Sequence, residues 1–226
     1  MCLLRVPYKM LLAPIPPFSL NAGNTALLLM DAQRFTTSRR EGLGALASER
    51  GIDREFDEYY AQVDVALGNM ARLLAACRAR GMTVVHTVLC GVRADGSDWS
   101  RQMRVSGLPL PVGDPRRQIR SEVAATADEI VISRTTYSPF VGTDLEAKLG
   151  SRQLDTILVA GMLANYSVWQ AAREASDRDF RVVVVMDCCA SETLAWHTQL
   201  RIGVIGGLIR QRSCDEVIEM LEGTRT

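Results

Sequence analysis

The stretch from Asp155 to Ser191 constrains the fold more than any other part of the chain. It contains an apolar run that ends at Gly161, a short turn, a segment with helical spacing, and a second apolar run over residues 182–187. Continuous apolar runs are typical of strands buried on both faces, and two such strands joined by a helix form a βαβ unit of a parallel sheet. The turn places Ser167 at the predicted start of the helix. Because open α/β sheets bind ligands at the carboxyl ends of their strands, this turn is the first candidate for a functional site.

Other segments continue the alternation of strands and helices along the chain. Apolar runs predict strands over residues 25–30, 82–87 and 129–133, with a possible last strand over 206–210. Sequence spacing and end signals predict helices over residues 58–80, 143–150, 168–177 and 191–204, and a terminal helix that ends near Leu221. This alternation favours a three-layer α/β/α fold with a mostly parallel, doubly wound sheet. We expect a single domain over residues 23–226, preceded by an N-terminal arm over residues 1–22.

Local signals add detail between these elements. Thr143 with Glu146, and Ser213 with Glu216, have the spacing of capping boxes at helix starts. Residues 34–57 are polar and contain Gly, which predicts a surface excursion. Residues 91–127 carry Gly and Pro without a sustained period, and a loop of this length in a compact domain is usually a lid or a binding loop.

The composition narrows the classes of partner and compartment. Lys plus Arg and Asp plus Glu both number 26, so the formal net charge is zero and a general attraction to nucleic acid or acidic lipid is not indicated. No stretch approaches the roughly 20 apolar residues that cross a bilayer. Pro14, Pro16 and Pro17 interrupt the apolar arm and no clean cleavage site follows, so we expect the arm to pack on a neighbouring surface. The six cysteines lack paired metal-ligand spacing, which favours a reduced, cytoplasmic protein without a metal or other cofactor.

Three polar residues stand at equivalent places in the predicted sheet. Asp31, Arg134 and Ser167 each follow the end of a predicted strand or the turn after it. Because the carboxyl ends of parallel strands meet at one edge of a sheet, we expect these side chains to lie together. The spacing of these three residues does not by itself indicate which reaction they would catalyse.

Five motifs indicate what that chemistry is. They are Ala26-Leu-Leu-Leu-Met-Asp31-Ala-Gln33; Val84-Val-His-Thr87; Arg134-Thr-Thr-Tyr-Ser-Pro-Phe140 with Gly142-Thr-Asp-Leu145; Gly161-Met-Leu-Ala-Asn-Tyr-Ser167-Val168; and Asp187-Cys-Cys-Ala-Ser191 followed by His197. With these motifs the chain resembles the isochorismatase-like hydrolases, the cysteine hydrolase superfamily, from about Thr25 to Leu221. The motifs together are specific for that fold and less specific for one activity.

The resemblance implies a catalytic set with two substitutions. The Asp, Lys and Cys of the family fall on Asp31, Arg134 and Ser167, so only the Asp is kept. The resemblance also implies a cis peptide bond between Met162 and Leu163, with an oxyanion hole formed by the N–H groups of Leu163 and Ser167. Family members are commonly homo-oligomers, so it implies a dimer or tetramer that acts on a small molecule, without nucleic acid or membrane as partner.

Further candidates lie beside the same strand ends. The predicted lining of the substrate pocket is Gln33, Phe35, Cys90, Tyr137 and Tyr166. Cys90 is also a candidate substitute thiol, although free cysteines are more often buried as small hydrophobic residues. For the same reason, we expect Cys188 and Cys189 to be packing residues. His86 is expected to be a buried strand histidine, and His197 to support its helix, because the Asp and two His of a nicotinamidase-type metal motif are absent.

The two substitutions change the expected chemistry. A Ser hydroxyl is far less acidic than a Cys thiol, whose pKa is about 8.5, so it needs a well-placed base. Arg keeps the positive charge of Lys but not its geometry or its titration, and it can clamp a carboxylate through two N–H groups.

Three hypotheses therefore stay open. In the first, the protein hydrolyses a small amide with Ser167 as a weakened nucleophile. In the second, Asp31 protonates a vinyl ether of an isochorismate-like substrate as general acid, and Arg134 binds the substrate carboxylate. In the third, the protein is a catalytically inactive relative that binds a small molecule or a protein partner. A laboratory Cys-to-Ser change at position 167 is a fourth explanation, but it leaves Arg134 unexplained.

Overall fold

The computed structural model describes Leu11 and residues 19–108, 110–203 and 209–223 of the chain. Most of the predicted N-terminal arm therefore lies outside the described residues. Its last described part contributes Leu20, which is fully buried in the core.

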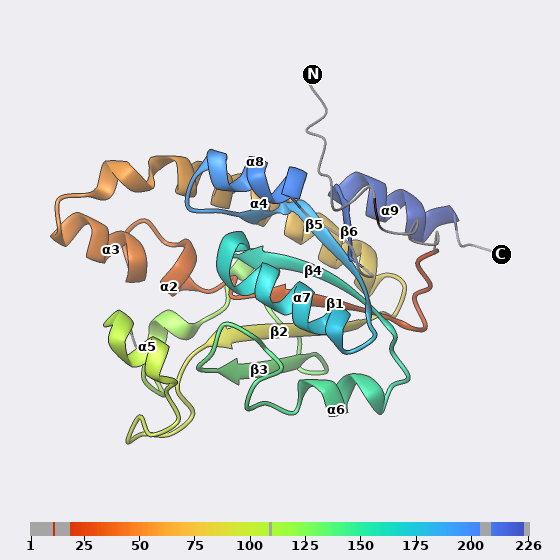
Figure 1. Ribbon diagram of the computed structural model, residues 1–226, viewed down its shortest axis with the longest axis horizontal. Coiled ribbons are helices and arrows are strands. Elements are labelled where there is room, and N and C mark those ends of the chain that lie inside the picture. Colours follow the sequence, from red (N-terminus) through yellow and green to blue (C-terminus); the bar gives the residue numbers. More distant parts are fainter. Residues whose placement is uncertain (1–10, 12–18, 109, 204–208, 224–226) are drawn as a thin grey trace.

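The described residues form one six-stranded sheet in which every strand pairing is parallel (Figure 1). The strands are β1 (Thr25–Met30), β2 (Thr83–Leu89), β3 (Ile130–Arg134), β4 (Thr156–Met162), β5 (Arg181–Ala190) and β6 (Ile209–Arg212). Their order in the sheet is β3-β2-β1-β4-β5-β6. The chain thus builds outward from β1 in one direction and then, from β4, in the other. The predicted doubly wound α/β fold is confirmed, with its topological switch point between β1 and β4.

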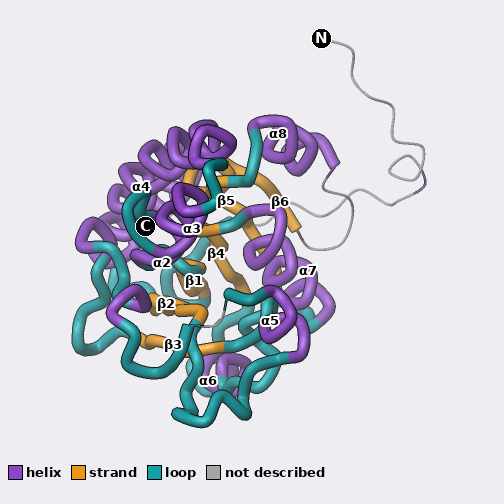
Figure 2. The backbone as a smooth tube through the Cα atoms, turned by 90° about the vertical axis from the view of Figure 1, so that its left-hand side faces the viewer, coloured by secondary structure: helices purple, strands orange, loops and turns teal. Residues whose placement is uncertain are grey.

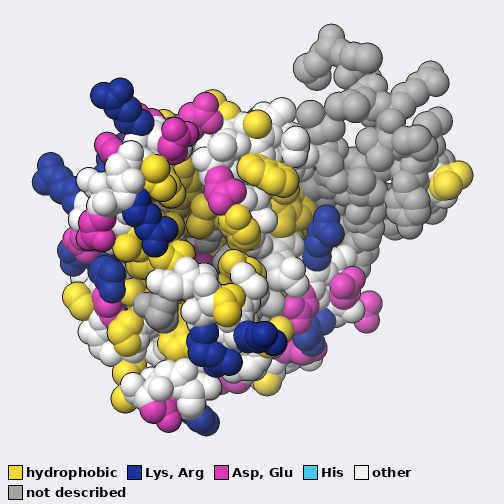
Figure 3. All heavy atoms as spheres, turned by 60° about the vertical axis from the view of Figure 1, so that its left-hand side comes forward, with side chains coloured by type: hydrophobic (Ala, Val, Ile, Leu, Met, Phe, Trp, Pro, Cys, Tyr) yellow, Lys and Arg dark blue, Asp and Glu magenta, His cyan; other side chains and the backbone are white. Residues whose placement is uncertain are grey.

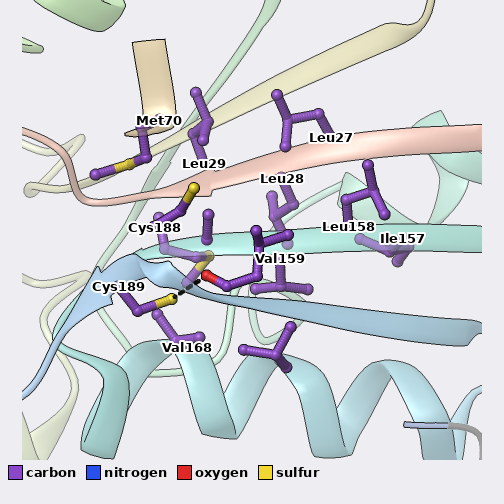
Figure 4. Packing of buried hydrophobic residues seen from close by; sticks show 14 of the residues in the cluster. Leu27, Leu28, Leu29, Met70, Ile157, Leu158, Val159, Val168, Cys188 and Cys189 are labelled. Carbon is purple, nitrogen blue, oxygen red and sulfur yellow. Dashed lines mark hydrogen bonds between the residues drawn. The ribbon is translucent and has the colours of Figure 1, made fainter. Parts of the chain in front are cut away.

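Helices cover both faces of the sheet and bury its apolar strands. The long helix α4 (Asp57–Arg78) packs with α9 (Cys214–Gly223) on one face, and α6 (Leu145–Gly150) and α7 (Trp169–Asp177) lie on the other (Figure 1). In Figure 4, Met70 of α4 and Val168 lie on opposite sides of the strands that carry Leu28 and Leu158. This arrangement places the core between the layers and leaves the carboxyl ends of the strands facing one side, onto which Figure 2 looks.

Two regions predicted as irregular contain helices. Residues 34–57 form α2 (Arg34–Thr37), α3 (Gly42–Glu49) and the 3-10 turn η1 (Asp53–Phe56), helical elements that the sequence did not indicate. Residues 91–127 contain α5 (Arg101–Ser106) and the short turns η2 (Pro115–Arg117) and η3 (Ser121–Val123). These segments close around a small second core of Phe35, Trp99, Met103 and Leu110. Burial against this core, and not a regular period, orders them.

Helix ends and strand ends refine the prediction. The capping box of α9 is confirmed: Ser213 N–H donates to Glu216 Oε2 at 2.6 Å, and Glu216 N–H donates to Ser213 Oγ at 3.2 Å. The capping box of α6 is wrong, because the helix begins at Leu145 and the Thr143 hydroxyl accepts from the Leu145 N–H at 3.3 Å and not from that of Glu146.

The predicted end of β5 is also wrong, because the strand continues to Ala190 and includes both Cys188 and Cys189. Both cysteines are buried, and the Cys189 thiol donates to the Val185 carbonyl at 3.2 Å (Figure 4). The next helix, α8 (Leu194–Gly203), starts three residues later than the sequence indicated.

The surface near the strand ends carries both signs of charge. On the face shown in Figure 3, basic and acidic side chains are interspersed and hydrophobic side chains lie between them. Of the helices in the described ranges, none combines the length and the apolar composition that crossing a membrane requires.

Candidate active site

Asp31, Arg134 and Ser167 come from three strand ends and meet in one buried cluster. Asp31 directly follows β1, Arg134 ends β3, and Ser167 lies in η4 (Ala164–Val168), a turn of π-helix after β4. The Arg134 guanidinium forms an ion pair with Asp31, and its Nη2 donates to Ser167 Oγ over 3.0 Å. The Ser167 hydroxyl also helps to hold down the pKa of Asp31. The cluster lies at the topological switch point, where open α/β sheets bind their ligands.

Arg134 is enclosed by the protein, with 2% of its surface exposed. Its Nη1 donates to the Thr136 carbonyl, its Nη2 serves Asp31 and Ser167, and its Nε lies 3.5 Å from Thr87 Oγ1. Burial lowers the pKa of this guanidinium while the charge of Asp31 works against that change, and arginine stays protonated in proteins. Because its N–H groups are engaged inside the protein, Arg134 is placed to hold Asp31 and Ser167. These contacts do not support its role as a clamp for a substrate carboxylate.

Opposing influences act on the pKa of the Asp31 carboxyl. Burial raises the pKa of Asp31 above its usual 3.8, while the positive charge of Arg134 and hydrogen bonds from Thr87 and Ser167 oppose the rise. Thr87 Oγ1 donates to Asp31 Oδ1 at 2.9 Å. The backbone of Asp31 has a φ of 51°, a left-handed conformation that Asp adopts more readily than most residues. A buried carboxyl with a perturbed pKa and a specific charge partner is a candidate acid or base.

The turn after β4 is built on a close approach of two strands. Gly161 has a φ of 137°, and a Cβ atom there would lie 2.0 Å from the carbonyl oxygen of Met30. Only Gly therefore allows β4 to approach the end of β1 this closely, just before Asp31. The peptide bond between Met162 and Leu163 is cis, as the resemblance implied. Ser167 lies inside this turn and not at a helix start, and its hydroxyl faces Asp31 and Arg134 instead of capping α7.

Three of the predicted pocket residues form the frame around the strand ends. The Gln33 amide joins β1 to β2, since it donates to the Leu89 carbonyl at 3.2 Å and accepts from the Leu89 N–H at 2.7 Å. Phe35 is buried in the second core. Cys90 is fully buried, and its thiol donates to the Gly91 carbonyl at 3.1 Å. A role for these residues in binding substrate stays a prediction.

The two predicted tyrosines form an aromatic surface beside the turn. Tyr137 and Tyr166 stack with their ring centroids 5.5 Å apart and an interplanar angle of 23°. Tyr166 is 39% exposed and directly precedes Ser167 in the chain. Its hydroxyl donates to Glu192 Oε1 at 2.9 Å. An exposed ring face therefore lies next to the Ser167 turn.

A cavity of about 240 Å³ lies beside the carboxyl end of β3. Arg134 and Thr136 line it from one side, and Val92 and Asp98 line it from the loop after β2. Its volume is below the roughly 300–1,000 Å³ that is usual for pockets of drug-sized ligands. A ligand that entered here would be small.

Sequence reasoning missed several residues that hold this cluster. Thr87 supports both Asp31 and Arg134, and its pairing with Met30 in the β1–β2 register places it at the strand ends. The sequence signal for Thr87 was its place at the end of the Val84-Val-His-Thr87 motif. Asn165 and Glu192 bond to each other across the Ser167 turn, and no local pattern in the sequence joins them.

The two histidines lie apart from the cluster. His86 is buried in β2 and its Nε2 lies 3.0 Å from Glu129 Oε2, as expected for a strand histidine with a partner. His197 Nδ1 lies 3.4 Å from Ser191 Oγ. Among the residues that the structure describes, no group of three or more His, Cys, Asp or Glu side chains has an arrangement that would hold a metal ion.

The fold and the cluster define an α/β protein with a polar site at the sheet's switch point, and comparison with known proteins gives its family. The isochorismatase domain matches residues 25–201, so the chain belongs to the isochorismatase family of hydrolases. An uncharacterized isochorismatase family protein of Escherichia coli O157:H7, YecD, is 29% identical over 89% of this chain and 98% of its own length. A maleamate amidohydrolase of Pseudomonas putida is 32% identical over 69% of this chain and 75% of its own length.

Solved structures agree on the fold. The crystal structure of a cysteine hydrolase from Pseudomonas syringae pv. phaseolicola superposes with a TM-score of 0.75 and 23% identity. The match covers 93% of this chain and 98% of that one.

Proposed function

We propose that this protein hydrolyses a small amide, with Ser167 as nucleophile and Asp31 as the acid and base. The observation that carries the proposal is the position of the Ser167 hydroxyl, which accepts at 3.0 Å from the same Arg134 Nη2 that pairs with the buried carboxyl of Asp31. A nucleophile within hydrogen-bond reach of a base that a third group orients is the arrangement that activates a hydroxyl. Similarity to a maleamate amidohydrolase supports an amide as the substrate.

The residues divide the first half of the reaction between them. Ser167 Oγ attacks the carbonyl carbon while its proton passes to Asp31, and the adjacent charge of Arg134 stabilises the developing alkoxide. The N–H groups of Leu163 and Ser167 receive the negative oxygen of the tetrahedral intermediate. The C–N bond then breaks, and the proton on Asp31 passes to the departing nitrogen. The products of this half are an amine or ammonia and an ester of Ser167.

The second half regenerates the enzyme. Water attacks the ester carbonyl and gives a proton to Asp31, and the proton returns to Ser167 Oγ as the acid product leaves. Each proton that Asp31 accepts is given back within the same half-reaction, so the cycle consumes one water and one amide. A carboxyl whose pKa burial has raised is suited to this exchange.

The test compares Ser167→Ala with Ser167→Cys on a panel of small amides, esters and enol ethers. Ser167→Ala should lower amide kcat/KM by about 10³-fold or more, because the bond-forming atom is lost. Ser167→Cys should remain active, since a thiol ionises more readily than a hydroxyl. Intact-mass measurement during turnover should show an acyl adduct on the wild type and none on the Ala variant.

A second candidate function, vinyl-ether hydrolysis with Asp31 as general acid, is favoured by the raised pKa of this carboxyl. Full activity of Ser167→Ala on an enol ether would establish it in place of the amide proposal. An absence of turnover on every compound, with binding of a small amide retained, would instead indicate a relative that only binds.

A further inference from the structure

The Ser167 turn is held from outside by the segment that follows β5. Glu192 in this segment accepts from Asn165 Nδ2 at 3.0 Å and from the Tyr166 hydroxyl at 2.9 Å. The Glu192 N–H also donates to Asn165 Oδ1 at 3.3 Å. One residue therefore bonds to both positions that immediately precede Ser167.

The segment that carries Glu192 is itself fixed to α4. Gln62 Nε2 donates to the Ser191 carbonyl at 3.0 Å, and the Ser191 N–H donates to Gln62 Oε1 at 3.2 Å. Two residues beyond Glu192, the Leu194 N–H donates to Glu58 Oε2 at 3.1 Å. Glu192 thus links the Ser167 turn to the longest helix of the described chain.

The chemistry of these contacts suits a permanent link. Within the described ranges no ion pair joins Glu192 to a basic side chain, so its carboxylate serves the two neutral donors of the turn. Burial and the bond to Glu192 raise the pKa of Tyr166 to about 12, so its hydroxyl stays a donor at neutral pH. Hydrogen bonds to an ionised acceptor are stronger than those between neutral groups.

We propose that Glu192 is a positioning residue for the hydrolytic reaction. By fixing Asn165 and Tyr166, it keeps Ser167 Oγ between Asp31 and Arg134 and keeps the Tyr166 ring stacked on Tyr137. This inference rests on the proposed function for its kinetic consequences, and its structural consequence is independent of turnover.

The kinetic test is Glu192→Ala, which removes both side-chain acceptors. A misplacement of about 1 Å in an active site costs on the order of 100-fold in rate, so kcat should fall about 10- to 100-fold. KM should change little, and the acid limb of the pH profile should move little, because Arg134 and Thr87 keep their bonds to Asp31. Glu146→Ala, which loses only the exposed ion pair with Arg178, is the matched control and should match the wild type. An unchanged kcat in Glu192→Ala would overturn the proposal.

A swapped pair separates positioning from a general loss of stability. Glu192→Gln alone places an amide N–H group against the Asn165 N–H group. Asn165→Asp alone places a second carboxylate against that of Glu192. Each single variant should therefore lower kcat. In the double variant, the new amide at position 192 donates to the new carboxylate at position 165 and still accepts from Tyr166, with the same net charge as the wild type. The double variant should return to within about threefold of wild-type kcat. A double variant no better than the worse single variant would contradict the proposal.

Hydrogen exchange distinguishes failure of this inference from failure of the proposed function. In Glu192→Ala, the backbone amides of residues 163–168 should exchange at least about tenfold faster, and the swapped pair should restore their protection. This measurement needs no substrate. Unchanged exchange would overturn the positioning role even if the enzyme is active, and faster exchange in a protein without turnover would leave the link intact while the amide proposal fails.

Discussion

Two buried carboxyl clusters in this protein use similar groups and reach opposite electrostatic results. At the carboxyl ends of the strands, Asp31 pairs with Arg134 and lies beside Ser167. Next to the amino end of β3, Glu129 pairs with Arg78 and lies beside His86. Burial raises the pKa of Asp31, whereas the pKa of Glu129 falls to about 2.

The extent of burial and the hydrogen-bond donors around each carboxyl explain why the two pKa values move in opposite directions. Burial also raises the pKa of Glu129, but two bonds from Arg78 at 2.8 Å, one from the Thr126 N–H at 3.0 Å and the contact with His86 outweigh it. Arg78 remains 35% exposed, so this cluster stays close to water, whereas the side chain of Arg134 is fully enclosed with Asp31. The Glu129 cluster is fixed as an ionised structural link, and the Asp31 cluster has the raised pKa that the proposed acid and base role uses.

Replacing Asp31 should produce the largest effect, because it removes the proposed proton carrier and a buried charge partner together. Asp31→Asn should lower kcat/KM by about 10²–10⁴-fold, the usual contribution of a general acid or base. It also leaves Arg134 buried without its counter-charge, which should cost about 3–5 kcal/mol in the free energy of unfolding. Steady-state kinetics and urea unfolding measure the two losses.

A double variant separates the two losses. Asp31→Asn combined with Arg134→Met removes both charges, so it should recover stability without activity. Recovery of activity would show that Asp31 has only a structural role, like Glu129.

Replacing Glu129 should give the opposite pattern. Glu129→Gln should leave kcat/KM within about twofold of the wild type and reduce the unfolding free energy at pH 7 by about 1.5–3 kcal/mol, the range for hydrogen bonds to charged groups. Because the folded pKa of Glu129 is below its usual 4.5, its stabilisation is present above that pH and is lost as the pH falls toward 2. Urea unfolding at several pH values should therefore show the two proteins converging in acid. A constant difference across pH 7 to 3 would contradict the assigned charge.

The smallest effect should come from Thr87→Val, which keeps the shape and removes the hydroxyl. That hydroxyl helps to hold down the pKa of Asp31, so its loss should raise the pKa and move the acid limb of kcat/KM to higher pH. Asp31 must be ionised to accept the Ser167 proton, which gives the shift its sign. The lost bond should cost about 1 kcal/mol of stability. Thr83→Val, at the start of the same strand, is the control, and an equal shift there would remove the assignment to Asp31.

A helix or strand could be predicted from the sequence where the residues that form it lie close together in the chain. The strands were readable because runs such as Ala26–Met30 and Val182–Val185 must be apolar on both faces of a covered sheet. The capping box of α9 was readable because both of its residues lie within one turn. The helices α2, α3 and α5 were missed, since contacts with distant residues order them, such as the bond from the Tyr59 hydroxyl to the Thr36 carbonyl at 2.8 Å.

The sequence by itself determined the α/β class, the strand ends that carry Asp31, Arg134 and Ser167, and the turn at Gly161. Strand patterns repeat over a few residues, so local chemistry was sufficient for these. Only the tertiary structure decided that Arg134 faces inward to Asp31 and Ser167, that Gln33 and Cys90 are engaged in framing contacts, and that Glu192 bonds to the Ser167 turn. The physical reason is that burial and hydrogen-bond partners set the protonation and direction of a polar side chain, and both come from strands far apart in the chain.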